Sequence, residues 1–97
     1  MRDFQKGMYA RSLAGHDKGR LHIIVSVDDA YVYLADGKVR TLDHPKKKKH
    51  RHVQADSHID PVIMEKMNSS QGLRDEDVKR AIKLKEAQKQ EVRNVKG

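Results

Sequence analysis

The sequence predicts a mainly β fold, in which a small five-stranded barrel is followed by a C-terminal α-helix. Residues 8–54 contain short β-branched segments separated by turn signals, whereas the chain from about residue 74 to residue 92 has helical periodicity. The 97 residues are 36% hydrophobic and 36% charged, which is enough for one small core. We therefore expect a barrel over residues 1–60, a linker over 61–72 and a helix over 73–95 that packs partly on the barrel.

Residues 21–27 form the clearest strand, because every second residue is apolar from Leu21 onward. The two acidic residues at 28–29 signal a turn into a second strand over residues 30–34. A two-residue turn would place Ile23 opposite Leu34 and would put the alternating apolar residues of both strands on one face.

Asp36 and Gly37 form the strongest short hairpin signal in the chain. They predict a third strand of this meander over residues 39–42. Residues 8–13 and 52–55 are the candidates for two outer strands. Five short strands with tight turns are typical of a small, strongly bent barrel.

The C-terminal helix is predicted from three acidic residues in its first turn, at positions 75–77, which favour the positive end of the helix dipole. Val78, Ala81 and Ile82 then form an apolar stripe. Lys85 and other polar residues continue that stripe further along, so only the first turns of the helix are expected to dock on a core.

The positive charge of the chain is concentrated in one short run. The net charge is +7, from 21 Lys and Arg and 14 Asp and Glu, and five of the positive charges lie between Lys46 and Arg51. Residues 1–45 and residues 54–97 each carry a net charge of only +1. Such a run attracts polyanions, and nucleic acid is the first partner to consider.

Two other interpretations of the basic run stay open at this stage. It could be a solvated charged loop, or a nuclear localisation signal of four lysines after a proline. Phosphate binding is the leading interpretation, in which lysines supply affinity and position without reading bases. With about five phosphates neutralised, the logarithm of the binding constant should fall with log salt at a slope near −4.

Tyr31 and Tyr33 alternate onto the face opposite the apolar one, where Tyr33 would lie beside Arg40. They could form a base-stacking surface with that arginine. Alternatively, they could form a second, minor core under the C-terminal helix with their hydroxyls at its rim.

Four histidines, at positions 44, 50, 52 and 58, raise the question of a metal site. Neighbouring lysines repel a cation and the chain has no cysteine, so we expect no metal and no other cofactor. His50 and His52 are instead expected to add charge to the basic run when protonated. RNA affinity should then rise as the pH falls from about 7.5 to about 6.

A loop bracketed by Gly15 and Gly19 is the remaining candidate contact. His16, Lys18 and Arg20 could meet a phosphate or a flipped base there, together with backbone N–H groups. The alternative is a tight turn in which Asp17 caps its own backbone.

Four segments, taken in order, resemble the KOW motif: residues 7–12 (GMYARS), 14–20 (AGHDKGR), 36–38 (DGK) and 45–50 (PKKKKH). The match is to the KOW-containing ribosomal proteins of the archaeal and eukaryotic large subunit and their small bacterial relatives. It covers about residues 6–54, and the helical tail resembles that of the bacterial relatives. The resemblance implies an SH3-like barrel that binds structured RNA, usually ribosomal RNA, with the glycine-flanked loop and the basic run facing the RNA.

We therefore predict an RNA-binding module associated with the ribosome, which docks by phosphate and shape contacts and has no chemistry of its own. The expected RNA-binding residues are His16, Lys18, Arg20, Arg40, Lys46, Lys47, Lys48, Lys49, His50, Arg51 and His52. A protein-interaction adaptor is the alternative, because SH3-like barrels also bind proteins. An enzyme is disfavoured, since no nucleophile with a placed base, paired carboxylates or phosphate loop is present.

The expected setting follows from the same features. No apolar segment reaches the roughly 18 residues that could span a membrane, and the first residues have no apolar targeting segment. We expect a cytoplasmic protein that is monomeric when free and that contacts RNA and, in the ribosome, ribosomal proteins.

Overall fold

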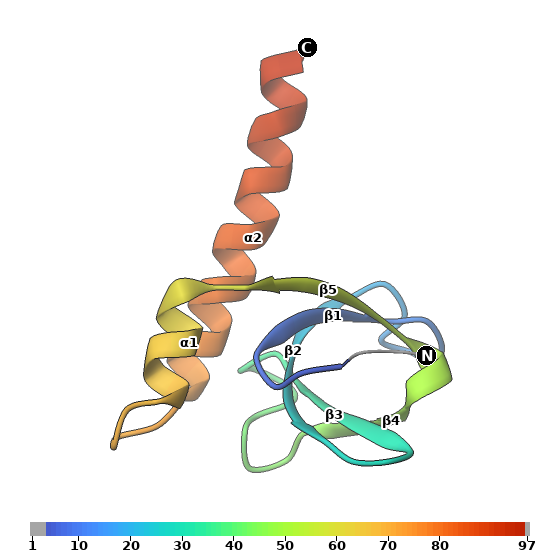
Figure 1. The fold of residues 1–97 in the computed structure, drawn as a ribbon. Helices are drawn as coiled ribbons and strands as arrows, with labels where there is room; N and C mark the ends of the chain where they lie inside the picture. The colour runs from blue at the N-terminus through green and yellow to red at the C-terminus, as the bar shows by residue number, and fades with distance from the viewer. Residues whose placement is uncertain (1–3, 97) are drawn as a thin grey trace.

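The computed structural model describes residues 4–96, with side chains described for residues 4–88 (Figure 1). The mainly β prediction with a C-terminal helix is confirmed. The elements are β1 (Met8–Ser12), β2 (Leu21–Val27), β3 (Tyr31–Ala35), β4 (Lys46–Lys49), the short 3-10 helix η1 (His50–His52), β5 (Val53–Ile59), α1 (Pro61–Met67) and α2 (Asp75–Lys96).

The five strands form one antiparallel sheet in the order β4-β3-β2-β1-β5. The sheet curls strongly, so that β1 and β5 lie across from β3 and β4, with η1 leading from one side to the other (Figure 1). Register shifts in β1, between Met8 and Tyr9, and in β2, between Ile24 and Ser26, mark where the strands bend. These ladders leave β4 and β5 as the two edges of the sheet.

The register of β2 with β3 differs from the predicted one. Leu34 pairs with Ile24 rather than with Ile23, and a bulge follows before Val27 pairs with Val32. The bulge adds a residue on β2 and so reverses which side chains face inward. The prediction that Ile23 shares a face with Leu34 was therefore wrong.

The turn that joins β2 to β3 is longer than two residues. The Asp28 carboxylate accepts hydrogen bonds from the N–H groups of Ala30 at 3.1 Å and Tyr31 at 2.7 Å. This local capture of the backbone by an aspartate makes Ala30 part of the turn, and the strand begins one residue later.

The predicted strand over residues 39–42 does not form, because local hydrogen bonds capture its N–H groups. The Asp36 carboxylate accepts from the backbone N–H groups of both Lys38 and Arg40 at 2.9 Å. The Leu42 N–H donates instead to the Asp75 carboxylate of α2 at 2.8 Å. Residues 36–45 are therefore a loop between β3 and β4, and the lysine run takes the place next to β3.

The sheet has a core on each face. Inside the curl, Met8, Ala10, Ile24, Val32, Leu34 and Val53 form one buried cluster. On the outer side of β1 and β2, a second buried cluster joins the sheet to both helices through Tyr9, Leu21, Ile23, Ile63, Val78 and Ala81. Because β1 and the first half of β2 are covered on both faces, four of the five residues of β1 and the first four residues of β2 are buried in place of a simple alternation.

The segment expected as a linker, residues 61–72, contains the helix α1. The Asp60 carboxylate caps this helix by accepting from the N–H groups of Val62 at 2.8 Å and Ile63 at 3.2 Å, and Pro61 stands in its first turn. Ile63 is fully buried in the second core. The Asp60-Pro61 pair at the start of this segment is therefore a helix start signal.

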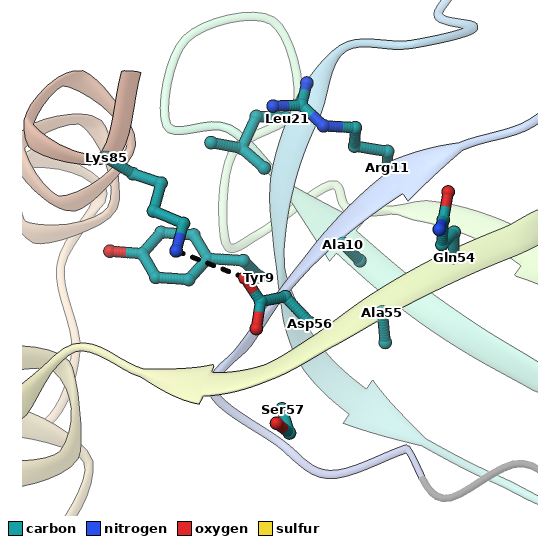
Figure 2. A pocket seen from close by; sticks show the side chains of 9 residues that line it. All are labelled: Tyr9, Ala10, Arg11, Leu21, Gln54, Ala55, Asp56, Ser57 and Lys85. Atoms are coloured by element: carbon teal, nitrogen blue, oxygen red, sulfur yellow. Dashed lines mark ion pairs between the residues drawn. The ribbon is translucent and has the colours of Figure 1, made fainter. Parts of the chain in front are cut away.

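The first turns of α2 pack on the sheet. Val78 and Ala81 are buried, whereas the helix beyond them extends away from the sheet (Figure 1). The Tyr9 hydroxyl donates to the Ala81 carbonyl at 3.2 Å, and the Lys85 ammonium pairs with Asp56 at 3.1 Å (Figure 2). These two contacts fasten the second and third turns of the helix to the sheet.

Candidate nucleic-acid interface

The four consecutive lysines form the edge strand β4 and point alternately to its two faces. Lys47 and Lys49 are exposed, whereas Lys46 is half-buried and Lys48 is buried with 9% of its surface exposed. A run that is uniform in sequence is therefore divided into two pairs with different surroundings.

Lys48 holds the glycine-flanked loop against the sheet. Its ammonium donates to the Ala14 carbonyl at 2.7 Å and pairs with the Asp17 carboxylate at 3.2 Å. Asp17 also accepts from the Ser12 hydroxyl at 3.1 Å. Because the Lys48 ammonium is occupied on the inner side of β4, we remove this residue from the predicted RNA-binding set.

The charge state of Asp17 fits this structural role. Partial burial tends to raise the pKa of the Asp17 carboxyl, but hydrogen bonds from Lys48 and Ser12 and the lysine charge outweigh it, and the pKa is lowered. The carboxylate therefore stays ionised opposite the lysine. The loop is a turn closed by Lys48 in which the Lys18 N–H also donates to the Gly15 carbonyl at 3.2 Å.

Two tyrosines accompany the two exposed lysines on the outer face of β3 and β4. In the register of these strands, Tyr31 lies opposite Lys49 and Tyr33 opposite Lys47. The Lys47 ammonium lies 4.2 Å from the centre of the Tyr31 ring, a cation–π contact. We call Tyr31, Tyr33, Lys47 and Lys49 the outer face.

The tyrosines of the outer face do not form the minor core under the C-terminal helix. The Tyr33 hydroxyl donates to Asp28 at 2.9 Å, and both rings are half-buried. The tyrosine under α2 is Tyr9, whose pKa is raised to about 12 by burial first and then by the charges of Asp60 and Asp56. The expected contact of Tyr33 with Arg40 is also not formed, because Arg40 lies in the loop after β3.

A cavity of about 290 Å³ lies between the glycine-flanked loop, the loop after β3 and the inner side of β4. Five of the predicted RNA-binding residues line it: His16, Arg20, Arg40, Lys46 and Lys48, of which Lys48 is already bonded to Ala14 and Asp17. The carboxylates of Asp17 and Asp36 also line it, but Lys48 and backbone N–H groups occupy them. The cavity therefore presents cations that come from three separate segments of the chain.

One residue that lines this cavity, His22, was not among the predicted RNA-binding residues. It is buried with 1% exposure, and its Nδ1 lies 3.0 Å from the Arg20 carbonyl oxygen, a contact that requires the proton on Nδ1. Alternation along β2 would have placed it on an exposed face. Its burial follows from β2 being covered on both sides, which the sequence pattern did not indicate.

The last three predicted residues form η1 and not a strand with alternating faces. The His50 ring packs on Phe4 with 4.9 Å between ring centres, and its Nε2 lies 3.0 Å from the Asp28 carbonyl oxygen. Arg51 is exposed and His52 is half-buried. His50 therefore ties the strand connections together, and Arg51 is the residue of η1 most available to a phosphate. Lys18 is also exposed, at the tip of the glycine-flanked loop.

A further cavity, of about 430 Å³, lies beside β1, β5 and α2 (Figure 2). Its polar groups largely satisfy one another: Lys85 pairs with Asp56 and lies 5.1 Å from the centre of the Tyr9 ring, on which His58 is stacked at 6.0 Å. This cluster holds α2 on the sheet, and we do not include it in the interface.

Two general properties of the described residues bear on the site. Within residues 4–96, no helix combines the length and apolarity that crossing a membrane requires. In the same part of the chain, no group of three or more His, Asp or Glu side chains is arranged to hold a metal ion.

The chain matches no protein-family model and no curated protein sequence.

Proposed function

We propose that this protein is a KOW-type RNA-binding protein that docks on structured RNA through phosphate contacts. The observation that carries the proposal is the outer face, where two tyrosines of β3 lie opposite two exposed lysines of β4. Aromatic rings next to lysines suit the unpaired loops of a structured RNA, because unstacked bases can stack on the rings while phosphates meet the ammonium groups.

The cationic cavity supports the same partner. Arg20, Arg40 and Lys46 come from three separate segments of the chain, yet they line one hollow. Converging cations repel one another, and the two carboxylates of the cavity are already bonded by Lys48 and by backbone N–H groups, so a bound anion would relieve this repulsion. RNA offers phosphates at regular intervals, so it could occupy both the cavity and the outer face.

The class of RNA and the cellular setting rest on the KOW resemblance. The glycine-flanked loop and the basic strand correspond to the segments that the resemblance directs toward RNA, and ribosomal RNA is the usual partner of that group. We propose a cytoplasmic, ribosome-associated binder with no catalytic chemistry, monomeric when free.

One other explanation of the lysines needs to be separated from RNA binding. Charged residues on an edge strand also prevent pairing with another chain, and β4 is an edge. A basic edge could equally receive an acidic segment of a protein partner, as the adaptor interpretation requires. Edge protection and an acidic protein partner both predict that the protein binds RNA only weakly.

Fluorescence anisotropy with a labelled RNA hairpin separates these explanations. Lys47→Gln/Lys49→Gln should weaken binding and reduce the salt slope by about 2, because two phosphate contacts are lost. The matched control, Lys66→Gln/Arg74→Gln, removes the same charge beside α1 and α2 and should bind like the parent. Equal weakening in both double variants would indicate nonspecific attraction and contradict the outer face as the site.

Stacking is tested on the same surface. Tyr31→Leu keeps an apolar side chain but removes the ring, and it should cost about 1–3 kcal/mol of binding free energy if a base stacks there. If Tyr31→Leu binds RNA with the affinity of the parent, no base stacks on Tyr31, and the ring serves only to position Lys47.

A further inference from the structure

A groove of about 850 Å³ runs between α2 and the β2 side of the sheet. Five cationic side chains line it: Arg20 and Lys38 from the sheet side, and Lys79, Arg80 and Lys83 from α2. The two acidic residues of the groove are Asp36, whose carboxylate is occupied by backbone N–H groups, and Glu86. The groove therefore carries a clear excess of positive charge.

The three basic residues of α2 lie on one side of the helix, because Lys83 is four positions from Lys79 and three positions from Arg80. All three are exposed. Beneath them, Leu21 and Ile82 line the groove with apolar surface, and Ile82 packs against the second core. A groove with an apolar floor and cationic walls suits a sugar–phosphate backbone, whose ribose faces are apolar and whose phosphates are charged.

The two walls of the groove are held at a fixed separation. Gly37 has φ +82°, and a Cβ there would lie 2.5 Å from the Asp75 carbonyl oxygen and 2.7 Å from Cγ of Lys79. The loop that carries Lys38 is thus packed directly on the first turn of α2. The Asp75 carboxylate bonds the same loop through the Leu42 N–H. The backbone positions that carry the cations of the two walls are therefore fixed before any ligand arrives.

The groove is continuous with the cationic cavity of the interface. Arg20 and Asp36 line both of them. A chain of phosphates that enters the cavity beside Lys46 can therefore continue past Arg20 toward Lys83. The Asp36 carboxylate on this path already accepts hydrogen bonds from backbone N–H groups.

We propose that this groove binds the sugar–phosphate backbone of a second segment of the same RNA, an inference that rests on the proposed RNA-binding function. The protein would then hold RNA at two places: the outer face with the cavity, and the α2 groove. The helix has a binding role in addition to covering the second core.

The test uses Lys79→Gln/Lys83→Gln, with Lys66→Gln/Arg74→Gln as a control that removes the same charge elsewhere. Anisotropy is measured with two labelled probes, a long RNA hairpin and its isolated single-stranded loop. The groove variant should lose affinity for the hairpin, with a salt slope reduced by about 2, and should bind the short loop like the parent. Lys38→Gln tests the opposite wall and should reduce the hairpin slope by about 1.

The outcomes separate the two proposals. If the parent binds both probes and the groove variant behaves like the control, the groove proposal is wrong and the RNA-binding function stands. If the parent binds neither probe, both proposals fail. If the groove variant keeps its RNA affinity but loses binding of poly-glutamate, the groove serves an acidic protein partner, and the RNA assignment of the groove is overturned. Unfolding midpoints by circular dichroism confirm that each variant is folded.

Discussion

Lys48→Met is the most informative substitution, because it separates the structural lysine from its exposed neighbours. Methionine keeps most of the aliphatic stem, so the packing of the strand is largely preserved. The substitution removes the ammonium that donates to the Ala14 carbonyl and pairs with Asp17. The Asp17 carboxylate is then left with the Ser12 hydroxyl and local backbone groups.

The size of the effect follows from the exposure of the pair. The Lys48 side chain is 10% exposed and the Asp17 side chain 19% exposed, so the pair lies between the surface and the interior. Breaking an exposed pair costs about 0–1 kcal/mol, and breaking a fully buried one costs about 3–5 kcal/mol. We expect a loss of about 2–3 kcal/mol, a large share of the stability of a small domain.

Urea unfolding followed by circular dichroism measures this loss. Lys49→Met is the matched control, since it makes the same chemical change one residue away on the exposed face, and it should shift stability by less than about 0.5 kcal/mol. Adding Asp17→Asn to Lys48→Met should recover part of the loss, because the uncompensated charge is removed. Equal urea midpoints for the two methionine variants would refute the division of the strand into structural and exposed lysines.

Further predictions concern one backbone position and two ionisable groups. Gly37→Ala should destabilise by at least about 2 kcal/mol in urea unfolding, because its Cβ meets the Asp75 carbonyl at 2.5 Å, whereas Gly19→Ala, at the same φ of +82° with nothing within 4 Å, should cost only about 1 kcal/mol. The pKa of Tyr9 is raised from 10.0 to about 12, so the folded state keeps its proton longer than the unfolded state. Stability should be fully present below about pH 10 and lost as pH rises toward about 12, and Tyr9→Phe should abolish this part of the alkaline loss in unfolding measurements. The pKa of Asp17 is lowered below 3.8, so its contribution should be present above that pH and lost as the pH falls through the folded value, and Asp17→Asn should flatten the acid limb of the stability curve.

The strands β2 and β3 were predictable, because alternating apolar residues mark each strand and a turn signal separates them. The bulge in β2 was not, since nothing in the Ile-Ile-Val run distinguishes a bulged register from a regular one. Its consequence is large: Ile23 faces the helices, and Ile24 faces the interior of the curl.

The position of the fourth strand shows why a hairpin signal can mislead. Asp36 and Gly37 do form a turn, but the Asp36 carboxylate holds two further N–H groups and so prevents the strand from starting there. The lysine run, in contrast, has low strand propensity and was interpreted only through its charge. An edge position tolerates lysines because one side of the strand faces solvent, and this depends on the tertiary arrangement.

The candidate site was partly predictable from the sequence. Charge and the glycine-flanked loop pointed to residues that the fold brings together in one cavity, among them Arg20, Arg40 and Lys46. The separate role of Lys48 was hidden, because identical side chains in a run differ only through strand alternation. The α2 groove was not predicted as a site either, because it depends on how α2 packs beside the loop after β3.

The most direct test of the central claim is a pull-down of this protein from a lysate of its source, with RNase-treated and untreated halves compared. We expect ribosomal RNA and large-subunit proteins in the untreated half, their loss after RNase, and reduced recovery with Lys47→Gln/Lys49→Gln. A protein partner that is retained after RNase treatment, with no RNA recovered from the untreated half, would contradict RNA binding and favour an adaptor.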